Sequence, residues 1–335
     1  MSVFTPVSLA EARLFLAQYD VGDVVDFQNI AAGVENSNFF VTTTRSRYVL
    51  TIFEKIPRGD LDFYIGLMLH LHNHQFGCAA PIADRAGNII NTLHDKPVAL
   101  VSRLEGGDIA HPTPTDCFAI GAALAQMHLI TRPDNGFSLK MPNWRGSTWR
   151  QEYAAALAPL ITPEEKQLLN DELNYQHGFD GLNLPRGIIH GDLFRDNVLW
   201  RAAEDASRRP ILGHLQVFDN PQKTPQMIDF YFACEEQFLF DVAVTVNDWC
   251  LDFAAYPQAK LDAAKLGALC AGYESVRPWT AAEHAAWPQM LRAAALRTWL
   301  GRLGYHYFPR DSELTHPKDH PFSQRLLQLH RGANT

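Results

Sequence analysis

The first hundred residues alternate between short apolar runs and turn residues, which is the pattern of a small β-sheet. β-Branched and aromatic residues are concentrated in segments 24–31, 37–44 and 46–53, which are separated by Gly33 and by a turn near Arg45. Runs of this length and composition predict strands. Three such strands in succession are most simply arranged as an antiparallel sheet.

Helical signals lie on either side of these strands. A capping box that begins at Ser8 predicts a helix over 8–18, and a longer apolar segment over 60–76 exceeds the length of one strand and is better explained by a helix. Two more strands are expected near 89–93 and 97–102. The first part of the chain therefore predicts a five-stranded sheet that carries at least one helix.

Helical periodicity dominates after the pair of glycines at 106–107. Thr162 and Thr280 are each followed three residues later by a glutamate, which marks two helix starts. Further helices are expected at 116–130, 240–253, 259–272 and 287–303. The sequence thus predicts an α+β chain with a sheet lobe over 1–104 and a larger helical lobe over 105–335.

Composition narrows the classes of protein to consider. The 335 residues are 47% hydrophobic and 20% charged, values typical of folded domains and unlike disordered, collagen-like or coiled-coil chains. A net charge of −8 makes nucleic acid and anionic membrane poor partners. The five cysteines are scattered, so we expect reduced thiols. The sequence has no apolar segment long enough to span a membrane and no signal-peptide pattern, and we therefore expect a cytoplasmic location. The oligomeric state is left open.

Reactive polar side chains gather in one short segment, GIIHGDLFRDNVLW at 187–200. Apolar residues enter and leave this segment, which predicts a polar loop between two buried strands. Asp192 and Asn197 are five residues apart, so a loop that turns back can direct one to a proton and the other to a cation. Another carboxylate, Asp229, follows a later apolar strand. An amide and a carboxylate are hard oxygen ligands that suit Mg²⁺.

The loop HGDLFRDN and the later IDF resemble the catalytic loop and metal motif of the aminoglycoside phosphotransferase and choline kinase group. Within that group the chain resembles the bacterial homoserine kinases of this fold. The segments that carry the resemblance are GVENSNFFV (33–41), YVLTIFEK (48–55), IHGDLFRDNV (189–198), IDFYFAC (228–234) and ESVRP (274–278). The resemblance implies a two-lobed protein-kinase-like fold, ATP and Mg²⁺ as cofactors, and phosphorylation of L-homoserine on the route to threonine.

The same resemblance implies roles for individual residues. Asp192 would accept or orient the proton of the attacking hydroxyl, with His190 bracing the loop. Asn197 and Asp229 would hold Mg²⁺ against the ATP phosphates, and Asp241 would organise the loops. The residues of the turn expected to cover the phosphates are Gly33, Val34, Asn36 and Asn38. The residues expected to offer backbone hydrogen bonds to adenine at the lobe junction are Ser102, Arg103 and Leu104.

One departure concerns the phosphate anchor. Thr51 occupies the place of the lysine that protein kinases carry on their third strand, and the helix over 60–76 has no glutamate to pair with such a lysine. Lys55 and Arg45 are the candidates for a replacement anchor. The absence of both the lysine and the glutamate also suggests an alternative to an enzyme, namely a non-catalytic nucleotide-binding protein.

Other departures concern the loop and the metal motif. Gly191 stands where many protein kinases have the arginine that reads a phosphorylated loop, and Tyr231 replaces the glycine of their DFG motif. Activation by loop phosphorylation is therefore not expected. The segment over 201–226 makes the link to Asp229 long, and Asp219 within it is a rival for the metal position.

The acceptor site is expected in the helical lobe. Homoserine is a zwitterion, so its site needs an acceptor for the ammonium group and a donor fork for the carboxylate. Arg297 and Arg302 are candidate forks, and Asp192 or Glu235 candidate acceptors; alternatively, both arginines are solvated or form structural ion pairs. Choline, methylthioribose or an aminoglycoside is the alternative acceptor.

Overall fold

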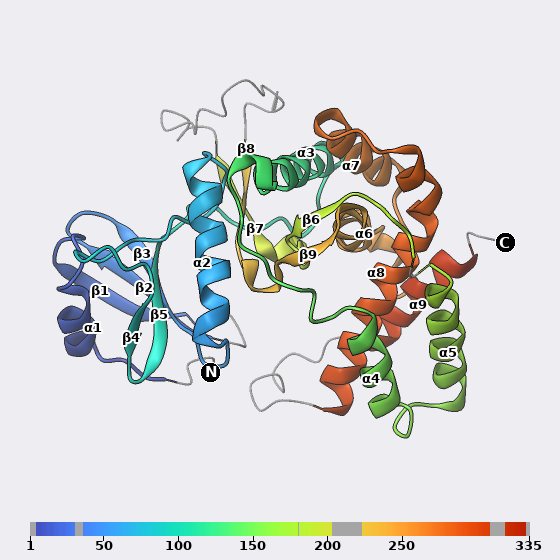
Figure 1. The fold of residues 1–335 in the computed structure, drawn as a ribbon, viewed down its shortest axis with the longest axis horizontal. Coiled ribbons are helices and arrows are strands. Elements are labelled where there is room, and N and C mark those ends of the chain that lie inside the picture. The colour runs from blue at the N-terminus through green and yellow to red at the C-terminus, as the bar shows by residue number, and fades with distance from the viewer. Residues whose placement is uncertain (1–4, 31–35, 180, 203–222, 309–318, 333–335) are drawn as a thin grey trace.

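A computed structural model describes residues 5–30, 36–179, 181–202, 223–308 and 319–332. The chain forms a sheet lobe, blue to cyan in Figure 1, and a larger helical lobe, green to red, with α2 (Arg58–Asn73) between them. This is the two-lobed α+β arrangement that the sequence predicts. The boundary predicted between residues 104 and 105 lies in the segment that joins the last sheet strand to the first helix of the helical lobe.

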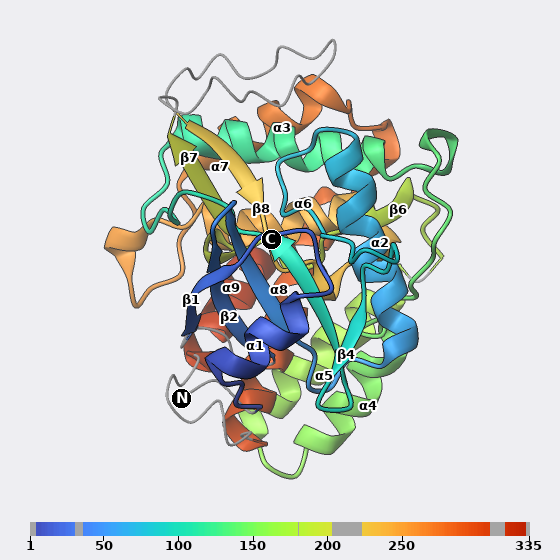
Figure 2. The ribbon, with the colours of Figure 1, turned by 90° about the vertical axis from the view of Figure 1, so that its left-hand side faces the viewer.

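The sheet lobe contains one antiparallel sheet with the strand order β1-β2-β3-β5-β4. Its strands are β1 (Val24–Asn29), β2 (Ser37–Thr43), β3 (Arg47–Ile52), β4 (Asn91–Leu93) and β5 (Lys96–Ser102). All five were predicted, with ends that differ by a residue or two. Buried positions alternate along β2, so one face of the sheet packs on α1 (Leu9–Leu16) and the other faces α2. Figure 2 shows α1 on the outer side of the molecule.

Helices form most of the second lobe. They are α3 (Pro114–Ile130), α4 (Ser147–Leu157), α5 (Pro163–His177), α6 (Phe238–Trp249), α7 (Ala263–Val276), α8 (Ala281–Tyr307) and α9 (His320–Gly332). The capping boxes predicted at Ser8, Thr162 and Thr280 are all formed. Helix α7 begins later than predicted, because the Asp262 side chain accepts two backbone N–H bonds of the first turn and so fixes the N-cap.

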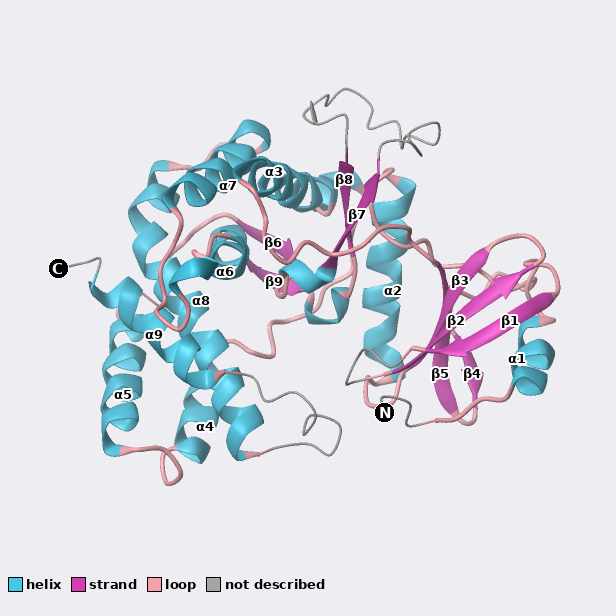
Figure 3. Cartoon of the chain, turned by 180° about the vertical axis from the view of Figure 1, so that it is seen from behind, coloured by secondary structure: helices cyan, strands magenta, loops and turns pink. Residues whose placement is uncertain are grey.

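Two short antiparallel ladders complete the helical lobe, together with single turns of 3-10 helix. The ladders pair β6 (Arg186–Ile189) with β9 (Cys234–Gln237), and β7 (Val198–Ala202) with β8 (Lys223–Met227). The 3-10 turns are η1 (Pro133–Asn135), η2 (Arg195–Asn197), η4 (Phe230–Phe232) and η5 (Phe253–Ala255). β7 and β8 lie beside α2, as seen from behind in Figure 3.

Helix α2 packs with both lobes. Leu61 of α2 belongs to a hydrophobic cluster that also contains Ile120 of α3 and Val198 of β7, whereas the outer face of the sheet forms a separate cluster with α1. The N–H of Met227 in β8 donates to the carbonyl of Gly77, just after α2, at 2.8 Å. The lobes therefore share a core on this side, which limits their independent movement.

Two expectations drawn from composition concerned the state of the cysteines and the absence of membrane-spanning segments. All five cysteines are free thiols, and four of them are buried. Within the described segments, no helix combines the length and the apolar character needed to cross a bilayer.

Helices α3 and α7 approach closely because each presents a glycine to the other. A methyl group on Gly121 would lie 2.1 Å from the carbonyl oxygen of Leu269, and one on Gly272 would lie 2.0 Å from that of Phe118. Both distances are far inside van der Waals contact, so the two backbones pack in this way only when neither position carries a side chain.

We expect Gly121→Ala to lower the free energy of unfolding by about 1–3 kcal/mol, because the added methyl group forces the two helices apart. Gly267→Ala is a matched control on the open side of α7, where nothing lies within 4 Å of the added carbon. It should raise stability by up to about 1 kcal/mol through helix propensity. Urea denaturation measures both changes, and equal effects would show that the close approach does not constrain the helices.

Candidate active site

The loop predicted to carry the chemistry joins β6 to β7. In the β7–β8 ladder Val198 pairs with Met227, and the N–H of Ile228 donates to the carbonyl of Asn197 at 3.0 Å. This register places Asp229, the residue after Ile228, beside Asn197 although a long segment separates them in the chain. The two predicted metal ligands are therefore brought together by strand pairing. The rival, Asp219, lies outside the described residues.

The side chain of Asn197 is oriented by the loop itself. Its Nδ2 donates to the carbonyl of Asp192 at 2.8 Å, so its oxygen is the atom presented to a cation. Asp229 has a φ of 63°, a left-handed conformation that is uncommon for a residue with a side chain. Among the described residues no group of three or more His, Cys, Asp or Glu could hold a metal ion. A cation here would take its remaining ligands from water and phosphate, as Mg²⁺ does.

Tyr231 fixes the short helix that follows Asp229. Its ring makes edge-to-face contacts with Phe53, just after β3, and with Tyr64 of α2, at centroid distances of 5.3 and 5.8 Å. The residue that replaces the glycine of the DFG motif therefore packs against the sheet and against α2 at the same time.

Asp192 is held by an arginine from α8. Arg297 Nη2 donates to Asp192 Oδ1 at 2.9 Å, and Nη1 donates to the carbonyl of Gly191. With a side chain only 7% exposed, Arg297 orients the loop and is not the open carboxylate fork that the sequence suggested. Arg302 lies five residues farther along α8, about 140° around the helix. Arg302 therefore points in a different direction from Arg297, and its role as a carboxylate fork stays a prediction.

His190 is buried, and both of its ring nitrogens are engaged. Nε2 lies 3.0 Å from the carbonyl of Ile228, which can only accept, so this nitrogen carries the proton. Nδ1 accepts the N–H of Asp192 at 3.3 Å. Burial lowers the pKa of His190 and keeps the ring neutral. This geometry fits a bracing role and leaves neither ring nitrogen for proton transfer.

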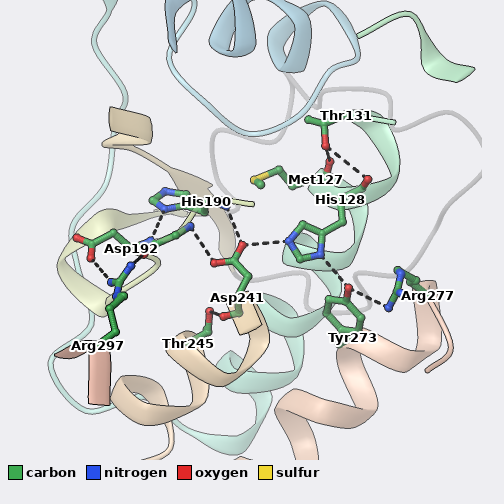
Figure 4. Close-up of polar contacts among 11 residues, drawn as sticks. Met127, His128, Thr131, His190, Asp192, Asp241, Thr245, Tyr273, Arg277 and Arg297 are labelled. Carbon is green, nitrogen blue, oxygen red and sulfur yellow. Dashed lines mark hydrogen bonds and ion pairs between the residues drawn. The ribbon is translucent and has the colours of Figure 1, made fainter. Parts of the chain in front are cut away.

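Asp241 of α6 anchors the same loop. Its Oδ2 accepts the N–H of His190 at 2.7 Å, and its Oδ1 accepts that of Gly191 at 2.9 Å (Figure 4). His128 of α3 adds a third donor, Nε2, at 3.0 Å. Burial alone would raise the pKa of Asp241, but these donors hold it below its ordinary value. The carboxylate is therefore ionised, and it organises the loop as predicted.

A chain of hydrogen bonds leads from α7 to this carboxylate. Arg277 donates to the Tyr273 hydroxyl at 3.3 Å, and that hydroxyl donates to His128 Nδ1 at 2.8 Å. Because an ionised carboxylate only accepts, His128 carries its proton on Nε2. Arg277 also pairs with Glu283 at 2.8 Å. The role of His128 was missed from the sequence, where its only signal is a lone histidine in an apolar helix.

The residues predicted to cover the phosphates are described only in part. Gly33 and Val34 lie outside the described residues. Asn36 is buried, and Asn38 Oδ1 accepts a hydrogen bond from Thr51 Oγ1 at 2.8 Å. Thr51 thus links β2 to β3 and supplies none of the charge that a lysine would bring.

At the lobe junction two of the predicted adenine donors are already engaged. The N–H groups of Ser102 and Arg103 donate to neighbouring backbone carbonyls at 2.8 and 3.0 Å. The groups of this segment that could still bind adenine are therefore its carbonyl oxygens and the backbone of Leu104. The Arg103 guanidinium lies on the ring of Phe40 at 3.9 Å.

The two candidate phosphate anchors lie at opposite ends of β3. Lys55 follows the end of β3 where Ile52 pairs with Ser37, the first residue of β2, and it is exposed. Arg45 lies in the β2–β3 turn, roughly 20 Å away along β2, where it pairs with Asp20 at 2.6 Å. This placement favours Lys55.

Glu235 and Glu236 point to opposite faces of β9. Cys234 pairs with Ile189, directly before the loop, and side chains alternate along a strand, so Glu236 shares the face of Cys234. Glu235 lies on the other face, with Oε1 3.9 Å from Arg186 Nε. Glu235 therefore lies on the face opposite Cys234, and its role as an acceptor for the ammonium group stays a prediction.

The phosphotransferase enzyme family matches the chain by its sequence profile over residues 26–208. A homoserine kinase from Methylobacillus flagellatus is 42% identical over 328 residues, which cover 98% of this chain and 95% of that protein. A homoserine kinase from Burkholderia mallei is 44% identical over 340 residues, covering 99% and 98%. The chain belongs to the phosphotransferase enzyme family.

A solved member of this fold confirms the architecture. The amicoumacin kinase hAmiN, in complex with AMP-PNP, Ca²⁺ and Ami, superposes with a TM-score of 0.69 over 96% of this chain and 94% of its own, at 14% sequence identity. The fold is the protein-kinase-like one that the loop motif predicted, and the chain is an enzyme with a hydroxyl acceptor.

Stability should fall as the pH drops below about 6.5. Burial lowers the pKa of His128, and lowers that of His330 to about 4. Below about pH 6.5 the unfolded chain binds protons that the folded chain does not. Each histidine therefore lowers the free energy of unfolding by up to about 1.4 kcal/mol per pH unit, until the pH falls below the pKa of that histidine in the folded chain. Urea denaturation at pH 7, 6, 5 and 4.5 should show this loss, and His330→Gln should reduce its slope. An unchanged slope in that variant would contradict the prediction.

Proposed function

We propose that the chain is an ATP-dependent homoserine kinase, which converts L-homoserine and ATP to O-phospho-L-homoserine and ADP on the route to threonine. The observation that carries this proposal is the convergence of Asp192, Asn197 and Asp229. Identity of 42% and 44% with homoserine kinases over nearly the whole chain supports the choice of acceptor.

The geometry suits direct transfer of the γ-phosphoryl group. The homoserine hydroxyl oxygen attacks the γ-phosphorus as the bond to the β,γ-bridging oxygen breaks, and ADP leaves. The hydroxyl proton passes to Asp192 Oδ2, since Arg297 holds Oδ1. Positioning and neutralisation of charge supply most of the rate, because the transition state is loose and anionic.

Asn197 and Asp229 fit a magnesium ion by the chemistry of their donor atoms. The amide oxygen of Asn197 is turned out by the bond from its nitrogen to the loop, and Asp229 adds a carboxylate beside it. Mg²⁺ bound there would neutralise charge on the phosphates. Lys55, close to the start of β2, is the proposed replacement for the missing lysine.

Asp192→Asn should lower kcat by roughly 10³-fold, because the amide cannot accept the hydroxyl proton. The Kd for Mg²⁺-ATP should stay near the wild-type value, since Asp192 is not a proposed metal ligand. Asp196→Asn is the matched control, an exposed aspartate in the same loop whose change should leave kcat nearly unaltered. Near-normal turnover in Asp192→Asn would reject the assigned role.

The acceptor is tested by ADP release from Mg²⁺-ATP with homoserine, choline, methylthioribose or an aminoglycoside, each compared with a no-acceptor reaction. Homoserine should give the highest kcat/KM. A higher value for another acceptor would change the substrate while keeping the reaction. Stabilisation by ATP without ADP release from any acceptor would favour the non-catalytic alternative.

A further inference from the structure

The loop between β6 and β7 is also held at its far end, by residues that have no part in the chemistry described so far. Asp248 lies seven residues after Asp241 on α6, so both carboxylates lie on one face of the helix, roughly 10 Å apart along its axis. Asp248 Oδ2 accepts the N–H of Arg195 at 2.9 Å. Trp249 Nε1 donates to the carbonyl of Leu193 at 3.0 Å. Helix α6 therefore binds the backbone of the loop at both ends.

The side chain of Arg195 adds to the contact with Asp248. Its Nε donates to Asp248 Oδ2 at 2.9 Å, and its Nη2 donates to Oδ1 at 3.4 Å. Its Nη1 donates to the carbonyl of Ala110, and its guanidinium carbon lies 4.2 Å from the centre of the Phe253 ring. Each nitrogen of the guanidinium group thus has a partner within the protein. This arrangement indicates that the pair fixes the loop and does not bind a ligand.

Asp248 caps the turn that carries Asn197. The 3-10 turn η2 begins at Arg195, and the residue before it, Phe194, has no side-chain group that could accept the first N–H of the turn. Asp248 supplies that acceptor from α6. The N–H of Asn197 closes the turn on the carbonyl of Phe194 at 3.0 Å. A shift at the start of this turn would therefore displace Asn197, the proposed metal ligand.

The end of the loop that carries the proposed base has separate supports. Arg297 binds Asp192, and Asp241 binds the two backbone N–H groups before it. Neither contact involves Asp248 or Arg195. Loss of the contact at Asp248 should therefore affect the metal ligand more than the proposed base.

We infer that Asp248 is a positioning residue for Asn197. It holds the first N–H of η2, so that the side-chain oxygen of Asn197 stays directed at the cation. Residues that orient a metal ligand in this way contribute on the order of 10- to 100-fold to metal affinity. The inference rests on the proposed function, because it takes Asn197 as a ligand of Mg²⁺.

A binding measurement that needs no turnover tests this inference. The Tm is followed as Mg²⁺ is added at a fixed, saturating concentration of AMP-PNP, and the Mg²⁺ midpoint is the concentration that gives half of the full rise. Asp248→Ala should raise the Mg²⁺ midpoint on the order of 10- to 100-fold. In assays of ADP release, the activity that this variant loses at low Mg²⁺ should return at high Mg²⁺, with KM for homoserine near the wild-type value.

Two milder variants separate the backbone contact from the ion pair. In Asp248→Asn the amide oxygen can still accept the N–H of Arg195, and in Arg195→Met the carboxylate keeps that same bond. Both should therefore raise the Mg²⁺ midpoint less than Asp248→Ala does. A larger rise in Arg195→Met than in Asp248→Ala would contradict the inference, because the cap of the turn would then not be the contact that positions Asn197.

Glu172→Gln is the control for a general loss of stability. Glu172 of α5 forms a buried ion pair with Arg292 of α8, in which Arg292 Nη2 lies 2.6 Å from Glu172 Oε2. The change should lower the Tm without moving the Mg²⁺ midpoint, because this pair joins two helices and not the loop.

Two results would overturn the inference. They are a Mg²⁺ midpoint in Asp248→Ala equal to that of the wild type, and an equal shift of the midpoint in Glu172→Gln. If Asp248→Ala does not fold, as judged by its Tm without ligands, Asp248→Asn takes its place, and an unchanged midpoint in that variant overturns the inference. A wild-type protein that does not respond to Mg²⁺ with AMP-PNP, or does not phosphorylate homoserine, would contradict the proposed function instead, so the two failures are distinguishable.

Discussion

The ionised carboxylate of Asp241 is the constraint on which the loop depends. An unpaired charge at this depth would cost several kcal/mol, so its oxygens must be surrounded by donors. Two of those donors are consecutive backbone N–H groups, at His190 and Gly191. Gly191 can direct its N–H inward because it adopts a φ of 75°, a region that glycine enters at little cost. With the backbone turned toward Asp241, the next side chain, that of Asp192, projects away from it.

The same carboxylate links loop shape to helix packing. His128 reaches Asp241 from α3, and α3 is held against α7 by the close approach at Gly121 and Gly272. Displacement of α3 would withdraw one donor from a buried charge, so the tight helix contact and the polar network stabilise each other. Arg297 completes the arrangement from α8, where it binds the carbonyl of Gly191 and the carboxylate of Asp192.

Most of the fold could be predicted because its signals are local. Strand composition and capping boxes depend on neighbouring residues, and both gave the elements that they marked to within a few positions. Helices α4 and α9 were not predicted. The pairing of Asn197 with Asp229 could be predicted in outline, since each follows or precedes a short apolar strand. The engagement of Arg297 with the loop and the support from His128 could not be predicted, because both are contacts between helices far apart in sequence.

The contacts of Tyr231 bear on how such an enzyme can be controlled. In protein kinases the packing of the residues after the metal-binding aspartate distinguishes active from inactive states. Here the ring of Tyr231 packs edge-to-face against Phe53, just after β3, and against Tyr64 of α2. Contacts of this kind favour one orientation of the ring. The two ring contacts hold the segment after Asp229 in one orientation, so any rearrangement of this segment would have to break contacts with the sheet and with α2 at the same time.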